Sequence, residues 1–286
     1  LYFYDESRKS HSKFEIQFES AVLVDQRVTA LAASKGQQLW VGFYRGGLQS
    51  INTMTGETYA PKIENASEMF VMDLFEDKAK NLWIATQTHG LIRVTSDKIY
   101  YYYSSGILIE KGVSLIFSGL DKLIVVSTKN KIYEYNYNTN RFSILDFDFG
   151  FGLDKTVIFS ISQSQNGDIW FGTKDHGLFQ WRNSDQKSKI FRLNHVGKGT
   201  ELEYATIYGI SSDVTGSLWC STQSGVLKLS SSGQPIKRFT MADGLQGGDF
   251  SFGASFTSQA GLIYFGGMNG YNRFDPNQIK IDSSES

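Results

Sequence analysis

One pattern occurs six times along the chain, and this repetition limits the possible folds more than any other feature of the sequence. Each copy has a short apolar segment whose second residue is large, then a loop that usually contains glycine, then an alternating segment. The large residues of the six copies are Trp40, Trp83, Ile124, Trp170, Trp219 and Tyr264. Successive copies lie 41 to 49 residues apart, which is the period of one four-stranded blade of a β-propeller.

The residues around each copy support the same architecture. An alternating segment and a polar turn precede the large residue, as in VTALAASKGQQ before Trp40, which indicates a strand, a hairpin turn and a strand. A third strand follows the loop, for example at residues 48–52, and a weaker fourth segment comes next, for example at 59–63 or 190–193. The composition of 14% aromatic residues, 28 Gly and only 3 Pro also favours twisted sheet with tight turns. We therefore predict an all-β protein, a β-propeller of four-stranded blades.

Two further positions of the repeat are small. The residue two places after the large one is Gly42, Ala85, Gly172, Ser221 or Gly266. We expect the large side chain to fill the gap between neighbouring blades and the small one to relieve crowding on the same face. The glycines before the third strand are Gly47, Gly90, Gly177, Gly225 and Gly270. They predict a positive φ in a tight connection between strands.

Residues 1–20 align with the back half of one repeat. We expect residues 1–286 to form a single β-propeller domain in which six repeats follow this leading half. A seven-bladed ring is favoured, with its first blade incomplete or completed from upstream, and a six-bladed ring is the alternative. Because the chain lacks an initiator Met and begins inside a predicted strand, we expect it to be part of a longer protein.

Composition and motifs exclude several classes of function. A formal net charge of −1 argues against nucleic acid as a partner, and no apolar segment approaches the length that spans a membrane. Cys220 is the single cysteine, so an internal disulfide framework is excluded, and we expect it to be a small buried apolar residue. The motifs of nucleotide-binding, serine-hydrolase and zinc-peptidase sites are missing. We predict no cofactor, no metal site and no catalytic residue.

The repeated frame, as in LWVGFYRGGLQSIN and IWFGTKDHGLFQW, resembles the two-component-regulator propeller repeat. The stretch from Asp243 to Ile281, with DGL and FGGMNGYNRFDP, is similar to the last blade of those proteins. The resemblance implies the periplasmic input domain of an inner-membrane receptor with a histidine kinase or diguanylate cyclase output. It also implies a homodimeric full-length receptor and, as in several relatives, an oligosaccharide or other small molecule as the ligand. The family has no universal set of ligand residues to carry over.

Ligand contacts of a propeller are expected where the loops after the second strands and the segments before the inner strands meet on one face. Candidates in the loops are Tyr44, Arg45, His89, Lys129, Lys174, Asp175, His176 and Asn269. Candidates before the inner strands are Arg27, Tyr204 and Asp249.

Several interpretations stay open at this stage. Residues 174–176 are ligand contacts, a solvated loop tip or, least in keeping with the other loops, an acid and base pair. Tyr100 to Tyr103 could stack on a sugar, but alternation favours packing of Tyr100 and Tyr102 on one side of an outer strand. The alternatives to a sensor are a lyase or hydrolase with a site at the channel mouth and a protein-interaction scaffold.

Overall fold

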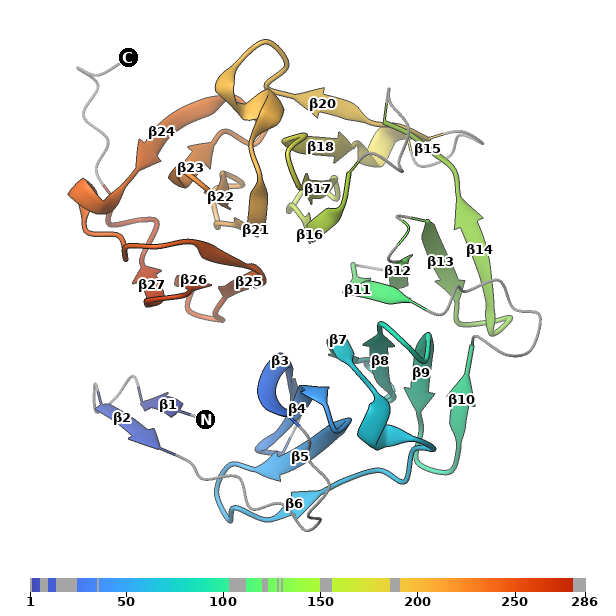
Figure 1. Cartoon of the computed structure of the whole chain (residues 1–286). Coiled ribbons are helices and arrows are strands. Elements are labelled where there is room, and N and C mark those ends of the chain that lie inside the picture. The colour runs from blue at the N-terminus through green and yellow to red at the C-terminus, as the bar shows by residue number, and fades with distance from the viewer. Residues whose placement is uncertain are drawn as a thin grey trace. The chain divides into compact units, whose positions relative to one another are not determined.

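The computed structural model describes residues 2–5, 10–13, 25–34, 36–102, 112–119, 123–127, 129, 131–149, 156–185 and 191–279. The chain divides into two compact units, unit 1 at Leu1–Ser118 and unit 2 at Gly119–Ser286. Both units consist of strands, and the helices of the described residues are short 3-10 segments such as η1 (Ala66–Glu68) and η5 (Met241–Asp243) (Figure 1). None of the helices in this described part is long and apolar enough to cross a membrane.

Two antiparallel four-stranded sheets make up most of unit 1. The first repeat forms β3 (Asp25–Ser34), β4 (Gln38–Arg45), β5 (Leu48–Asn52) and β6 (Thr58–Tyr59). The second forms β7 (Val71–Glu76), β8 (Leu82–Thr86), β9 (Leu91–Val94) and β10 (Ile99–Tyr101). The third repeat contributes β11 (Val113–Ser118), which lies beside β7. The hairpin of β1 (Tyr2–Asp5) and β2 (Ser10–Lys13) falls within residues 1–20.

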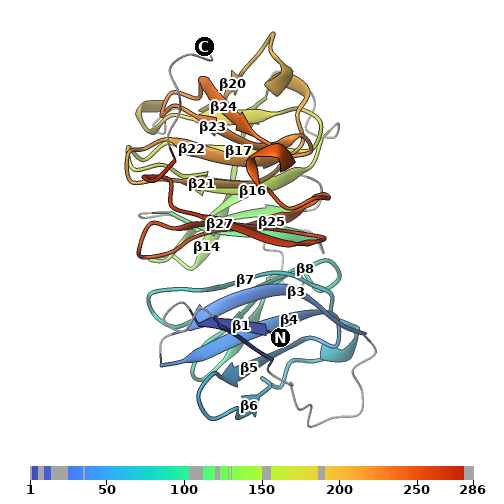
Figure 2. The same cartoon turned by 90° about the vertical axis from the view of Figure 1, so that its left-hand side faces the viewer.

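Unit 2 holds the rest of the third repeat and three more repeats. The third repeat gives β12 (Leu123–Ser127), β13 (Ile132–Asn136) and β14 (Arg141–Leu145). The fourth gives β16 (Ile158–Gln163), β17 (Ile169–Thr173), β18 (Leu178–Trp181) and β20 (Asn194–Val196). The fifth gives β21 (Ile207–Ser212), β22 (Leu218–Thr222), β23 (Gly225–Leu229) and β24 (Pro235–Phe239), and the sixth gives β25 (Phe250–Thr257), β26 (Ile263–Gly267) and β27 (Gly270–Phe274). The inner strand β21 lies between β16 and β25 and contacts both (Figure 1, Figure 2).

The predicted fold class is confirmed, because the chain is all-β and each of the six repeats supplies the strands of one propeller blade. Six blades in the described residues support the six-bladed alternative. The seventh blade of the favoured ring and the single domain over 1–286 stay predictions.

The repeat residues have the packing roles that their positions predict. Trp83, Trp170 and Trp219 are fully buried. A Cβ added to Gly42 would lie 2.5 Å from Val71 Cγ1, and one added to Gly172 would lie 2.7 Å from Ile207 Cγ2. Both contacts come from the inner strand of the following blade, so the small residue allows neighbouring blades to pack closely.

All five glycines before the third strands have a positive φ, between 67° and 117°, as predicted. At Gly177 the reason is more than the tight connection itself. A Cβ at Gly177 would lie 2.2 Å from the carbonyl oxygen of Leu202, so backbone from the next connection closes over this position. The loop at residues 174–176 is therefore held against the segment that follows β20.

The indole N–H groups of Trp83, Trp170 and Trp219 have acceptors that sequence analysis did not identify. Trp83 Nε1 donates to Asp77 Oδ2 at 2.9 Å, and Trp219 Nε1 donates to Asp213 Oδ2 at 2.9 Å. In the fourth repeat the acceptor is Ser164 Oγ, 3.1 Å from the indole nitrogen of Trp170. The acceptor lies in the hairpin turn six residues before the tryptophan in each case. These three buried indoles are thus each satisfied by a polar residue of their own blade.

The prediction of a fourth strand at residues 190–193 is wrong. β19 (Phe191–Arg192) pairs in parallel with β15 (Phe147–Asp148), and β20 is the fourth strand of this blade. The ring centroids of Phe147 and Phe191 lie 5.3 Å apart, and each ring lies 4.8 Å from that of Trp181. Burial of this aromatic cluster favours the pairing of β19 with β15 over continuation of the blade.

The packing interpretation of Tyr100 and Tyr102 agrees with the structure. The guanidinium carbon of Arg93 lies 4.4 Å from the ring centroid of Tyr100 and 5.9 Å from that of Tyr102. Tyr102 also stacks on Trp83 at 5.8 Å. The two tyrosines therefore lie on one side of the blade and enclose a buried arginine; Tyr103 lies outside the described residues.

Candidate functional site

A cavity of about 400 Å³ in unit 2 brings together two of the predicted candidates, His176 and Tyr204. We call it the His195 cavity. Its lining residues come from the loop after β17, from β15, β19, β20 and the residues next to these strands, and from the segment after β20. They are Asp148, Phe149, His176, Arg192, Leu193, His195, Lys198, Glu203 and Tyr204. The cavity is mostly lined by polar and charged side chains, which suits a polar small molecule.

Local sequence fixes the two ends of this cavity. On β20, the His195 ring stacks on Phe179 of the neighbouring β18, with centroids 4.4 Å apart and planes 15° apart. After β20, the Thr200 side chain accepts a hydrogen bond from the Leu202 N–H and begins η4 (Glu201–Tyr204). The η4 turn leaves the Tyr204 ring 69% exposed at the rim.

The protonation of the lining groups follows from their surroundings. Burial lowers the pKa of His195, although the Glu203 carboxylate opposes this, so the imidazole is neutral at neutral pH. The N–H of Gly199 donates to the Glu203 carboxylate at 2.6 Å and lowers its pKa. The negative charge of Glu203 in turn raises the pKa of Tyr204. The cavity therefore offers a neutral imidazole, a carboxylate and a phenol.

His195 also carries an unused hydrogen-bonding atom. Its Nε2 is buried and has no hydrogen-bond partner. Such atoms are uncommon in folded proteins and mark places where a ligand or water completes the bonding. The cationic Arg192 and Lys198 are exposed at the same cavity.

A second cavity of about 370 Å³ lies between the fifth and sixth repeats and contains the predicted Asp249. Its lining residues are Thr222, Gln223, Ser224, Gly225, Thr240, Met241, Leu245, Gln246, Gly248, Asp249 and Phe250, and we call it the Thr222 cavity. The predicted Asn269 supports its wall, because the Asn269 N–H donates to Gln246 Oε1 at 3.1 Å and its side-chain amide donates to the Gly247 carbonyl.

The three adjacent candidates Lys174, Asp175 and His176 have different surroundings. Asp175 has a left-handed φ of 61°, and its Oδ1 accepts a hydrogen bond from the Thr206 hydroxyl at 2.7 Å. His176 Nδ1 lies 3.2 Å from the Lys174 carbonyl oxygen, and the His176 side chain reaches the His195 cavity. The side chain of Lys174 is exposed.

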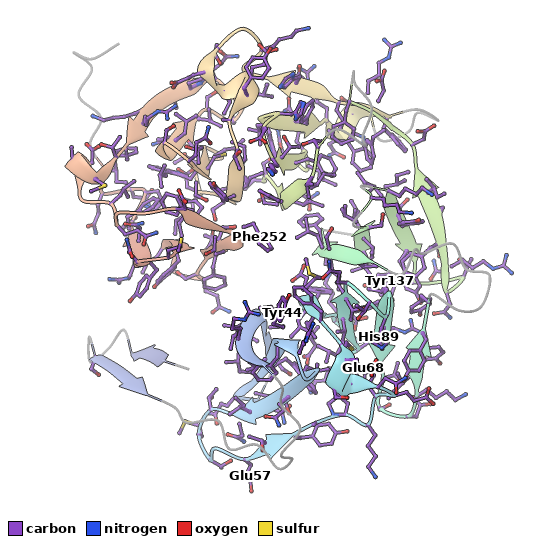
Figure 3. The ribbon with its side chains drawn as sticks, in the orientation of Figure 1. Tyr44, Glu57, Glu68, His89, Tyr137 and Phe252 are labelled. Carbon is purple, nitrogen blue, oxygen red and sulfur yellow. The ribbon has the colours of Figure 1, made fainter. Side chains whose placement is uncertain are left out.

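Three of the predicted residues of unit 1 also lie together. The Arg27 guanidinium carbon is 4.1 Å from the ring centroid of Tyr44, and that of Arg45 is 6.0 Å away. The Tyr44 ring also contacts Phe70, with ring centroids 4.2 Å apart. Tyr44 and His89 are labelled in Figure 3. This cluster is basic and aromatic.

The remaining candidates have local partners. His89 Nδ1 lies 2.7 Å from the Thr88 hydroxyl, and the Lys129 N–H donates to Ser127 Oγ at 3.3 Å. Among the residues that the structure describes, no group of three His, Cys, Asp or Glu side chains could hold a metal ion. Cys220 is buried as predicted, and burial raises the pKa of its thiol to about 12.

Sequence analysis missed Arg192, His195 and Glu203. They lie on β19, on β20 and after it, outside the part of the repeat that recurs, so comparison among repeats gives no signal for them. One signal was present, because Thr200 to Glu203 reads T-E-L-E, the pattern of a capped helical turn. That pattern predicts an ordered segment after β20 but not the cavity beneath it.

Residues 152–175 match a family model described as the two component regulator propeller. This match confirms the resemblance drawn from the repeated frame, and it covers about half the length of one repeat. No curated protein sequence matches the chain.

Several solved structures are similar to the chain. The extracellular domain of BT3049, named as a hybrid two component system protein of B. thetaiotaomicron, has 23% identity and a TM-score of 0.73 over 89% of this chain and 34% of that one. PorZ, a surface component of the type-IX secretion system of Porphyromonas gingivalis, has 17% identity and a TM-score of 0.63 over 86% and 38%. The extracellular domain of BT4673, named as a one component system protein of B. thetaiotaomicron, has 18% identity and a TM-score of 0.57 over 93% and 34%.

The TM-scores establish the propeller fold. The sequence identities are too low for these likenesses to establish more than the fold. The chain spans between 34% and 38% of the length of these three relatives.

Proposed function

We propose that the chain is a ligand-sensing propeller from the extracytoplasmic part of a bacterial transmembrane signalling receptor. The observation that carries this proposal is the two component regulator propeller match at residues 152–175 within a chain of six such repeats. Two of the similar structures, those of BT3049 and BT4673, are extracellular domains of signalling systems. A periplasmic location, an inner membrane anchor elsewhere in the protein and a histidine kinase or diguanylate cyclase output belong to the same proposal.

The ligand we propose is an oligosaccharide or a similar polar small molecule bound in the His195 cavity. Its lining contains both hydrogen-bond donors and acceptors, which suits the many hydroxyl groups of a sugar. The buried Nε2 of His195 is available for one of those hydroxyls. The exposed Tyr204 ring at the rim offers an apolar face to a pyranose.

Binding alone does not transmit a signal. The ligand must bind one of two arrangements of the receptor more tightly than the other. We propose that the full-length receptor is a homodimer in which the occupied propeller favours the signalling arrangement. The propeller itself has a binding role, not a catalytic one.

The enzyme alternative applies to the same cavity, because the neutral imidazole of His195 and the carboxylate of Glu203 are potential general bases. An oligosaccharide pool incubated with the chain and separated by chromatography distinguishes the two functions. We expect the pool to be unchanged, whereas new, shorter products would favour a lyase or hydrolase.

The proposed ligand class is tested by a thermal-unfolding screen against oligosaccharides. A ligand at a hundredfold excess over its Kd is expected to stabilise the folded chain by about 2.7 kcal/mol. The stabilisation should be reduced in Tyr204→Ala and Arg192→Gln, both of which change exposed side chains of the cavity. Arg141→Gln changes another exposed arginine of unit 2 away from the cavity lining and serves as the control. If no oligosaccharide shifts the transition, the sugar proposal is rejected.

A further inference from the structure

Three aromatic side chains from neighbouring inner strands of unit 2 form a continuous row. They are Tyr208 on β21, Phe159 on β16 and Phe252 on β25. The rings of Phe159 and Tyr208 are stacked with centroids 6.1 Å apart, and those of Phe159 and Phe252 with centroids 5.6 Å apart. We call these three side chains the aromatic row.

The aromatic row is a product of irregular strand pairing. The pairing register shifts between Ile158 and Ser160 and between Ile207 and Gly209, so Phe159 and Tyr208 occupy bulge positions. A similar irregularity between Phe250 and Ser255 contains Phe252. A bulge redirects a side chain away from the regular alternation of a strand and is frequent beside binding sites. Tyr208 also packs against the core cluster between the fifth and sixth repeats, whereas Phe252 remains exposed.

One end of the aromatic row is open. Phe252 is 57% exposed although one face of its ring lies on Phe159, so the other face is accessible to solvent. Figure 3 labels Phe252 on the inner strand of its blade. An exposed ring face carries partial negative charge and attracts cations.

Two carboxylates lie at the starts of β21 and β25, two of the strands that carry the aromatic row. Asp175 is joined to the start of β21 through the Thr206 hydroxyl, and the Thr206 N–H donates to Gln223 Oε1 at 2.8 Å. Gln223 and Asp249 line the same Thr222 cavity, and Asp249 directly precedes β25. Burial raises the pKa of Tyr208, and the charges of Asp249 and Asp175 raise it further. Both carboxylates therefore act on the phenol of the aromatic row.

Neither carboxylate is neutralised by a neighbouring side chain of the described part of the chain. Asp249 makes no ion pair and no side-chain hydrogen bond there, and Asp175 uses one carboxylate oxygen for Thr206. Lys174 is next to Asp175 in sequence but forms no ion pair with it. Two negative charges at the starts of the strands that carry these rings favour a cation over an anion in this region.

We propose that the aromatic row, together with Asp175 and Asp249, binds the ammonium group of a small organic cation. The open face of Phe252 provides the cation–π contact, and the two carboxylates provide the opposite charge. This site is separate from the His195 cavity, and its ligand class differs from the oligosaccharide proposed there.

The test is a calorimetric titration of the 286-residue chain with choline and with 3,3-dimethyl-1-butanol, its uncharged analogue of nearly the same shape. Choline should bind saturably and at least about tenfold more tightly than the alcohol, because the alcohol lacks the charge that the rings and carboxylates attract. Asp249→Asn and Phe252→Leu should each weaken choline binding by about fivefold or more. Both residues are exposed, so these changes leave the core unaltered.

The control is Glu57→Gln, which removes an exposed carboxylate in unit 1, labelled in Figure 3, and should leave the affinity for choline unchanged. Equal binding of choline and the alcohol would reject the ammonium proposal and indicate a neutral apolar site. Failure of choline to bind at all, or equal loss of binding in Glu57→Gln, would also reject it. Because the oligosaccharide screen uses changes at Tyr204 and Arg192, either proposal can fail without the other.

Discussion

Replacing Asp73 with asparagine is expected to remove a pH-dependent loss of stability from unit 1. Asp73 lies on the inner strand β7 opposite Ala85, at a position where the fifth repeat has Gly209 opposite Ser221. Its two carboxylate oxygens accept hydrogen bonds from the backbone N–H groups of Leu74 and Ile116, each at 2.8 Å. The Ile116 bond joins β7 to the neighbouring inner strand β11. A carboxylate therefore stands where other blades place a small residue.

The magnitude follows from the protonation of Asp73. Burial raises its pKa from 3.8 to about 6, and the two N–H donors oppose this only in part. Because the folded state binds the proton more tightly, this group stabilises the fold fully below the unfolded pKa and loses that contribution as pH rises through the folded pKa. The shift corresponds to about 3 kcal/mol, and residual solvent access to the side chain reduces the expected loss to about 1–3 kcal/mol.

The assay is urea unfolding of the wild-type chain and of Asp73→Asn between about pH 4 and pH 8. Asparagine cannot ionise but keeps one acceptor oxygen. Its own effect on the unfolding free energy is therefore the same at every pH. The informative quantity is the difference in unfolding free energy between the two proteins, which should move in favour of Asp73→Asn by about 1–3 kcal/mol as pH rises.

Asp97→Asn is the matched control in the same unit. Asp97 is exposed, and its hydrogen bond from the Thr95 hydroxyl lowers its pKa. Its contribution is present above the unfolded pKa and is lost as pH falls, so this control should show a small change of the opposite sign. A flat difference for Asp73→Asn across the range would refute the argument that a buried carboxylate destabilises this blade.

Two further predictions concern the repeat. Asp213→Ala removes the acceptor of the Trp219 indole and of the turn around residue 215, and should lower the unfolding free energy by about 2–4 kcal/mol in urea titrations; a loss below about 0.5 kcal/mol would show that the indole finds another partner. Gly177→Ala should cost about 3 kcal/mol or more, because the residue has positive φ and its Cβ would meet the Leu202 carbonyl. Gly199→Ala, with positive φ but open space, should cost only about 1 kcal/mol, and equal losses for the two variants would exclude the collision.

The recurring half of each repeat could be predicted because its residues pack between neighbouring blades and form the connection before the third strand in one repeat after another. Trp170 is buried, and Gly172 lies so close to the inner strand of the next blade that a Cβ there would meet Ile207. The positive φ at Gly177 follows from the same repeated connection. Residues with the same packing role in each blade recur at a fixed spacing in the sequence, and this periodicity predicted the fold class.

The fourth strands and the segments between blades could not be predicted in the same way. β19 pairs with β15 because Phe147 and Phe191 both pack on Trp181. His195 and Glu203 belong to this non-repeating part, so the larger of the two cavities escaped sequence analysis. The acceptors of the indole N–H groups, unlike these non-repeating residues, could have been predicted. Asp77 and Asp213 each lie six residues before a tryptophan, so an alignment of the polar turns could have found them.

The loop at residues 174–176 shows why adjacency in sequence is a poor guide to a shared site in this fold. Because Asp175 has a left-handed backbone, the directions of the three side chains diverge within a single turn. His176 reaches the His195 cavity, Asp175 bonds to Thr206 at the start of the next inner strand, and the Lys174 side chain remains in solvent. A tight connection at the edge of a blade thus faces two different neighbours, and its residues contribute to different sites. Candidate residues in a propeller are therefore better grouped by the segment that each one contacts than by their order along the chain.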